Sequence, residues 1–204
     1  SHFSPDTKSR MTEYEKWSIL LTKQAVKELA EKNRIDFGSI DRIITISCTG
    51  FFAPGLDYEL IKEFSISPSV KRTNIGFMGC AASLVGINSV WEAMNQNFSE
   101  NILMVSVELC SLHLQTEPTR DNILANMIFA DGAAAAYFSI TNISNKKKLA
   151  IQLAESFLFQ DSAKSMGWKI GNNGFEMMLS SDLPKIILNS AAPRAKEILV
   201  QKGI

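Results

Sequence analysis

Apolar residues recur along this chain at two different spacings, and each spacing predicts a different kind of element. From Met11 to Lys32 they recur every three or four residues, which predicts a long amphipathic helix. Residues Ile43–Cys48 and Asn101–Glu108 are instead nearly continuous apolar runs, which is typical of strands covered on both faces. The alternation of the two patterns over residues 1–140 predicts an α/β sheet with helices packed on it.

The remaining segments predict shorter elements. We expect a helix over 56–64, a short strand over 70–75, one or two helical turns over 122–128 and a small-residue strand over 133–140. Further along we expect a strand over 149–159, a loop over 168–173, a strand over 174–179 and a helix from Asp182 to about Gln201.

One polar segment divides the chain. Residues 142–148 contain a single apolar side chain, Ile143. We therefore expect a first unit over 1–141, a linker over 142–148 and the beginning of a second unit over 149–204.

The composition excludes several classes of protein. With 46% hydrophobic residues the chain can bury a core, and with 21 basic and 21 acidic residues it shows no excess charge for nucleic acid. No apolar run is long enough to span a membrane, and no signal-peptide pattern opens the sequence. The three cysteines form no CxxC pair, which favours reduced thiols over disulfides or a metal site. We expect a cytoplasmic protein.

The strongest local candidate for chemistry is Cys80. It follows Gly76 and Gly79, which permit a tight turn, and it precedes a run so apolar that it predicts a helix buried on all sides. The positive end of a helix dipole favours a thiolate, and a thiolate is the nucleophilic form of cysteine. The alternative, that Cys80 is a small buried apolar side chain, stays open on this pattern alone.

Four motifs in order give this residue a context. They are Thr49-Gly50 with Pro54-Gly55, then Gly76-Phe77-Met78-Gly79-Cys80-Ala81-Ala82, then Glu108-Leu109-Cys110-Ser111-Leu112-His113, and then Phe129-Ala130-Asp131-Gly132-Ala133. Together they resemble the type III polyketide synthases, the chalcone synthase-like branch of the thiolase superfamily. The resemblance is dense over residues 10–140 and thin beyond them.

The resemblance implies a thiolase-like layered fold, in which helices sandwich a mixed sheet and a central buried helix follows the nucleophile. It implies a homodimer in which Cys80 accepts an acyl group from a starter acyl-CoA and is extended with malonyl-CoA. CoA thioesters are then the substrates, with no cofactor, no metal, no nucleic acid and no membrane partner.

The resemblance also implies roles for other residues. Phe129 matches the phenylalanine that gates the family's cavity, and Cys48, Cys110 and His113 fall where the family lines that cavity. Ala53 falls where one subunit of plant members reaches into its partner. From the residues alone, Phe129 is better explained as a core aromatic beside a glycine turn, and Cys48, Cys110 and His113 are equally interior side chains.

The sequence departs from the family in one respect. The family uses a Cys-His-Asn triad, and neither His2 nor His113 matches the position of its histidine. We therefore expect a fragment that lacks the downstream His and Asn and a leading strand before Ser1, and that is inactive by itself. Two alternatives stay open: a condensing enzyme like β-ketoacyl-acyl carrier protein synthase III, and a non-catalytic interaction protein on a thiolase-like scaffold.

Overall fold

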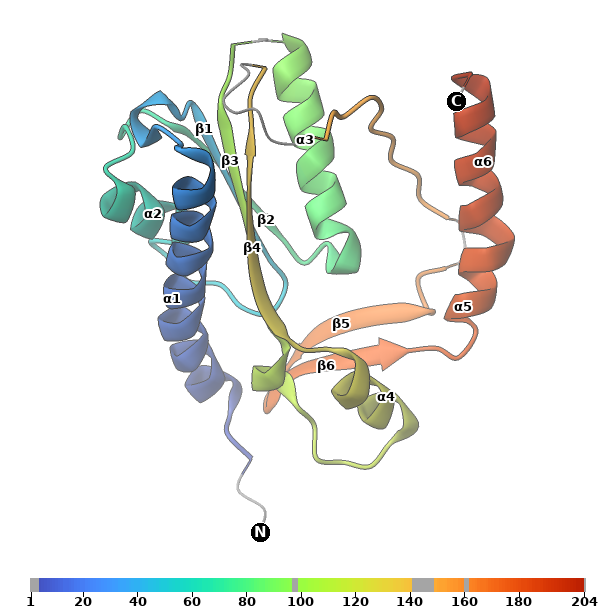
Figure 1. Cartoon of the computed structure of the whole chain (residues 1–204). Coiled ribbons are helices and arrows are strands. Elements are labelled where there is room, and N and C mark those ends of the chain that lie inside the picture. The colour runs from blue at the N-terminus through green and yellow to red at the C-terminus, as the bar shows by residue number, and fades with distance from the viewer. Residues whose placement is uncertain (1–3, 97–98, 141–148, 160–161, 204) are drawn as a thin grey trace.

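A four-stranded mixed sheet forms the centre of the fold (Figure 1). The computed structural model describes residues 4–96, 99–140, 149–159 and 162–203. In the sheet, β1 (Arg42–Ser47) runs parallel to β2 (Lys71–Gly76) on one side and to β3 (Ile102–Leu109) on the other. The last strand, β4 (Asp131–Phe138), pairs antiparallel with β3, so the order is β2-β1-β3-β4.

Helices cover both faces of this sheet (Figure 1). Helices α1 (Thr7–Asn33) and α2 (Leu56–Phe64) pack on one face, and α3 (Ala82–Gln96) packs on the other. Successive side chains of a strand point to opposite faces. Accordingly Ile43 is buried beneath α1 and α2, whereas Ile44 and Ile46 are buried beneath α3. This is the layered fold that the resemblance implied.

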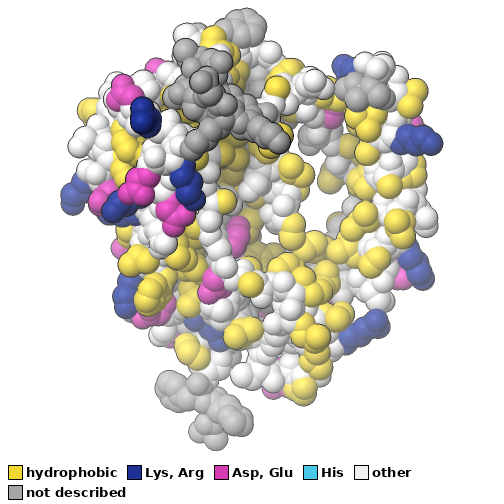
Figure 2. All heavy atoms as spheres, viewed as in Figure 1, with side chains coloured by type: hydrophobic (Ala, Val, Ile, Leu, Met, Phe, Trp, Pro, Cys, Tyr) yellow, Lys and Arg dark blue, Asp and Glu magenta, His cyan; other side chains and the backbone are white. Residues whose placement is uncertain are grey.

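The rest of the chain lies at one end of the sheet and beside α3 (Figure 1). Helix α4 (Arg120–Ile128) precedes β4, and β5 (Met166–Gly171) and β6 (Gly174–Leu179) form a separate antiparallel hairpin. A helical rod follows; it consists of α5 (Leu183–Ile186), a π-helical segment (Ile187–Ala191) and α6 (Ala192–Gln201). Figure 2 shows hydrophobic side chains gathered around the opening between this rod and the body of the molecule.

Two of the expected elements are wrong. Residues 149–159 form no strand, since no neighbouring strand pairs with them and Leu149 and Leu158 point into solvent. The loop expected over 168–173 is mostly strand β5, whose partner is β6. Both errors concern pairing, which an apolar pattern does not specify by itself. The linker predicted over 142–148 lies outside the described residues.

Helix α3 is less enclosed than its sequence suggests. Ala82, Gly86 and Val90 face the sheet, and an ideal Cβ on Gly86 would lie 2.7 Å from Ile46 Cδ1. Leu84, in contrast, is 67% exposed. The expectation of a helix buried on all sides is therefore met on one side only, because within the described residues the sheet covers just that side. Among these residues no helix is both long and apolar enough to cross a membrane.

Candidate active site

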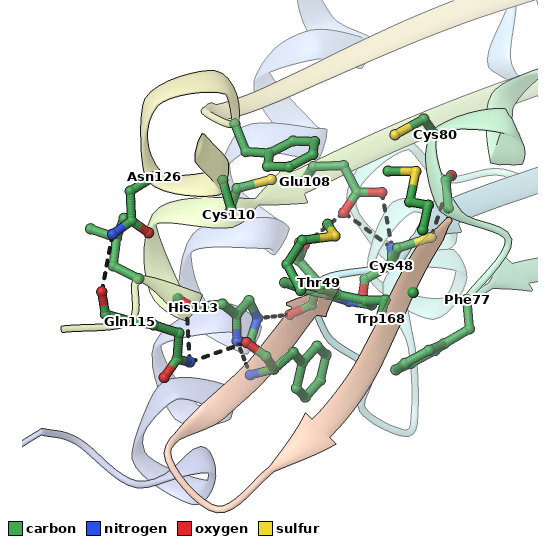
Figure 3. Close-up of a pocket in the computed structure, with 18 of the residues that line it drawn as sticks. Cys48, Thr49, Phe77, Cys80, Glu108, Cys110, His113, Gln115, Asn126 and Trp168 are labelled. Atoms are coloured by element: carbon green, nitrogen blue, oxygen red, sulfur yellow. Dashed lines mark hydrogen bonds between the residues drawn. The ribbon is translucent and has the colours of Figure 1, made fainter. Parts of the chain in front are cut away.

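The carboxyl ends of the three parallel strands open into one cavity of about 570 Å³ (Figure 3). Cys48 follows β1, the turn that carries Cys80 follows β2, and Glu108 is the last residue but one of β3. Loops at this edge of a parallel sheet are where ligands bind in α/β folds. Trp168 and Phe175 of the β5–β6 hairpin supply another wall.

Cys80 lies in a short 3-10 turn, Gly79–Ala81, that leads directly into α3. Its side chain is exposed and lines the cavity. The turn is sharp, because both Phe77 and Gly79 have a positive φ, of 55° and 62°. The sequence-based placement of Cys80 at the start of the helix is therefore confirmed, and the reading of Cys80 as a buried apolar residue does not hold.

Glu108 is the acidic group of the cavity. Its carboxylate accepts hydrogen bonds from the Cys48 backbone N–H, at 2.9 and 3.1 Å, and from the Thr49 hydroxyl at 2.7 Å. Burial raises the pKa of this carboxyl, although these hydrogen bonds oppose the rise. From the sequence, Glu108 has no assigned role beyond its place in a motif, although an acidic residue at the end of an apolar strand was an available signal.

The other two cysteines differ from Cys80 because they are partly or fully buried. Burial raises the pKa of the Cys48 thiol, and the charge of Glu108 raises it further. The pKa of Cys110 rises to about 11, first through burial and then through Glu108 and Asp131. Both thiols are therefore protonated at neutral pH, and a protonated thiol is a poor nucleophile.

His113 joins three parts of the site. Its Nε2 lies 2.6 Å from the Thr49 carbonyl oxygen, and its Nδ1 accepts a hydrogen bond of 2.9 Å from the Phe175 backbone N–H. A carbonyl can only accept, so Nε2 carries the proton and the ring is neutral. The ring stacks on Phe175 at 4.1 Å and contacts Trp168 edge-on at 5.4 Å. Because both of its ring nitrogens are hydrogen-bonded, His113 holds the Thr49 and Phe175 backbones together and offers no free general base.

The structure brings five of the six predicted site residues to one cavity. Phe129 lines it at the end of α4, together with Cys48, Cys80, Cys110 and His113. Ala53 does not line it, since this residue lies exposed in the loop before α2. No three His, Cys, Asp or Glu side chains converge as metal ligands within the described part of the chain.

Comparisons with known proteins agree with this geometry. The model of the FAE1/type III polyketide synthase-like family matches residues 2–165. A putative chalcone synthase of Bacillus subtilis is 31% identical over 159 residues, which cover 75% of this chain and 44% of that protein. The α-pyrone synthesis polyketide synthase-like Pks18 of Mycobacterium tuberculosis is 28% identical over 168 residues, 81% of this chain and 43% of Pks18. The chain thus spans less than half the length of these curated relatives.

Solved structures show the same likeness. The crystal structure of PKS-I from the brown alga Ectocarpus siliculosus superposes with a TM-score of 0.91 at 30% identity, over 98% of this chain and 54% of that one. The 1,3,6,8-tetrahydroxynaphthalene synthase of Streptomyces coelicolor, a bacterial type III polyketide synthase, superposes with a TM-score of 0.85 at 26% identity. That match covers 98% of this chain and 57% of the synthase.

Proposed function

Since the chain belongs to the FAE1/type III polyketide synthase-like family, we propose that it carries the acyl-accepting site of a polyketide-forming condensing enzyme. The Cys80 thiolate attacks the carbonyl carbon of a starter acyl-CoA, and CoA leaves as its thiolate. Malonyl-CoA then loses CO₂, and the resulting enolate attacks the Cys80 thioester. The new carbon–carbon bond forms as the Cys80 thiolate leaves, so the nucleophile is regenerated.

One observation carries this proposal: of the three cysteines that line the cavity, Cys80 is the exposed one, and it lies in the turn that leads into α3. Cys80 is exposed at the cavity wall, whereas Cys48 and Cys110 have raised pKa values. The cavity itself is mainly apolar, with aromatic side chains such as Phe129 and Trp168 along its walls. An uncharged acyl group suits these surroundings, because burying a charge in them is costly.

The wider assignment follows the family resemblance. We propose acyl-CoA and malonyl-CoA as substrates, no cofactor, a homodimeric assembly with Ala53 near the subunit contact, and a cytoplasmic location. The family match favours this branch over a fatty-acid condensing enzyme of the synthase III kind. Because His113 has both nitrogens engaged, we assign it no part in proton transfer.

The test is the intact mass of the chain after incubation with a panel of acyl-CoA thioesters. We expect an acyl adduct that a Cys110→Ala variant retains and a Cys80→Ala variant loses. Alkylation by N-ethylmaleimide shows independently that Cys80 is accessible. An adduct that persists in Cys80→Ala would place the acyl group elsewhere. Absence of any adduct, with Cys80 freely alkylated, would show that Cys80 accepts no acyl group in this chain by itself.

A further inference from the structure

The β5–β6 hairpin is connected to the turn that carries Cys80 by two routes, one direct and one through Cys48, and Figure 3 shows Trp168, Cys48 and Phe77 on these routes. Through one, the Phe175 ring lies 5.6 Å from the ring of Phe77, which precedes Cys80 by three residues. Through the other, Trp168 Nε1 donates a hydrogen bond of 2.7 Å to the Cys48 carbonyl. The Cys48 thiol in turn donates to the carbonyl oxygen of Gly79 at 3.7 Å, directly before Cys80.

The hairpin side of the first contact is firmly held. Phe175 is 1% exposed and stacks on the His113 ring with an angle of 13° between the planes. Its backbone N–H donates to His113 Nδ1. A ring packed in this way cannot change rotamer without opening the core, so Phe175 is a fixed surface for the ring of Phe77 that contacts it.

The turn side of the contact is a residue in an unusual conformation. Phe77 has a φ of 55°, a left-handed value that residues other than glycine adopt only at an energetic cost. Its ring meets Phe175 on one side and Phe51, at 6.2 Å and edge-on, on the other. Aromatic contacts of this kind add to stability beyond the burial of the rings. The contacts of Phe77 with Phe175 and Phe51 offset the cost of its left-handed backbone and hold the turn in place.

We propose that the β5–β6 hairpin, acting through Phe175 and Phe77, is the element that positions the Cys80 turn. Both phenylalanines are positioning residues, because neither contacts the reacting sulfur. The functional meaning of the inference rests on the proposed role of Cys80 as nucleophile. Acyl transfer requires an oriented sulfur, and a misplacement of about 1 Å can cost on the order of 100-fold in rate.

The test is a double-mutant cycle read by amide hydrogen exchange of the segment 76–82, which needs no substrate. We expect Phe77→Leu and Phe175→Leu each to speed exchange there by about fivefold, and the double variant to be no faster than either one. Phe157→Leu is the matched control, because that ring is 57% exposed and contacts Phe159 instead. It should leave the segment unchanged.

Three results would overturn the inference. Exchange in the segment could stay within about twofold in both single variants, or the two effects could multiply in the double variant. Exchange could also rise equally in β1 and β3, which would indicate general loosening of the fold. If Phe175→Leu does not fold, Phe77→Gly replaces it. Phe77→Gly removes the strain of the positive φ and also removes the ring, so unchanged exchange of the segment 76–82 in that variant also overturns the inference. Failure of acyl loading, in contrast, refutes only the proposed function.

Discussion

His113 allows the most quantitative prediction, since replacing its ring leaves two buried backbone groups without partners. In His113→Phe a flat ring can still stack on Phe175, but the Thr49 carbonyl and the Phe175 N–H both lose their hydrogen bonds. A buried polar group left unsatisfied costs about 1–3 kcal/mol. Two such groups give an expected loss of about 2–6 kcal/mol in the free energy of unfolding.

The measurement is urea unfolding at neutral pH, followed by tryptophan fluorescence because Trp168 adjoins the ring. His113→Gln is the control, since its amide offers both a donor and an acceptor and should recover part of the loss. If His113→Phe unfolds at the same urea concentration as the parent chain, the hydrogen bonds of His113 to Thr49 and Phe175 do not stabilise the fold as described. The slope of the unfolding curve shows whether the variant remains compact.

The pH dependence follows from the same ring. Burial lowers the pKa of His113 below its ordinary value of 6.5, with a further lowering by Arg10 and an opposing effect of Asp131. The unfolded chain therefore binds a proton at a higher pH than the folded chain does. The contribution of neutral His113 is fully present above pH 6.5 and is lost as the pH falls through the lower, folded value. The parent chain should lose stability over this range more steeply than His113→Phe, and equal pH profiles would contradict the assignment.

Two further predictions concern other parts of the site and fold. Glu108→Gln removes a charge that helps to raise the pKa of Cys110 to about 11, so alkylation of Cys110 should begin at lower pH, and an unchanged pH profile would show that the Glu108 charge does not contribute to this pKa. Gly50→Ala should lower the free energy of unfolding, measured by thermal unfolding, by more than about 3 kcal/mol, because the new Cβ would lie 2.2 Å from Cγ of the buried Tyr14. Gly132→Ala is the control and should be nearly neutral, since its Cβ would have no atom within 4 Å. Equal effects of the two substitutions would disprove the close packing at Gly50.

The first part of the chain could be predicted because most of its elements have a recognisable pattern in their own residues. Helix α2 begins and ends at the expected residues, and β1, β2 and β3 lie within one or two residues of the expected ranges. In α2, apolar side chains recur with the helical period, and in β1 and β3 they run continuously through strands covered on both faces, whereas β2 begins with the polar run Lys71–Asn74 and buries only Ile75. Such patterns require no knowledge of the partner element.

The later part depends on pairing between segments, which is where the predictions failed. Strand β5 contains exposed Lys169 and Ile170 beside a half-buried Trp168, so its pattern does not alternate cleanly. It becomes a strand because β6 pairs with it across a tight turn at Asn172 and Asn173. Residues 149–159 alternate better, yet within the described part of the chain no strand pairs with them and they form no strand.

The site shows the same division between local and long-range information. Cys80 could be located because glycines and the start of a helix flank it in the sequence. The contacts of Glu108 with Cys48 and Thr49 join residues about 60 positions apart, and that of His113 with Phe175 spans 62. Only the register of parallel strands and the docking of the hairpin bring these residues together.

Glu108 connects the architecture of the site with the selectivity that its chemistry requires. Its carboxylate fixes the end of β1 by accepting from Cys48 and Thr49, although burial makes the charged form costly. The same charge disfavours thiolates at Cys48 and Cys110. A cavity with three thiols could hold an acyl group in three places, and a condensing enzyme needs it in one. The residue that shapes the strand end also raises the pKa of the neighbouring thiols, which under the proposed function disfavours acyl transfer to Cys48 and Cys110.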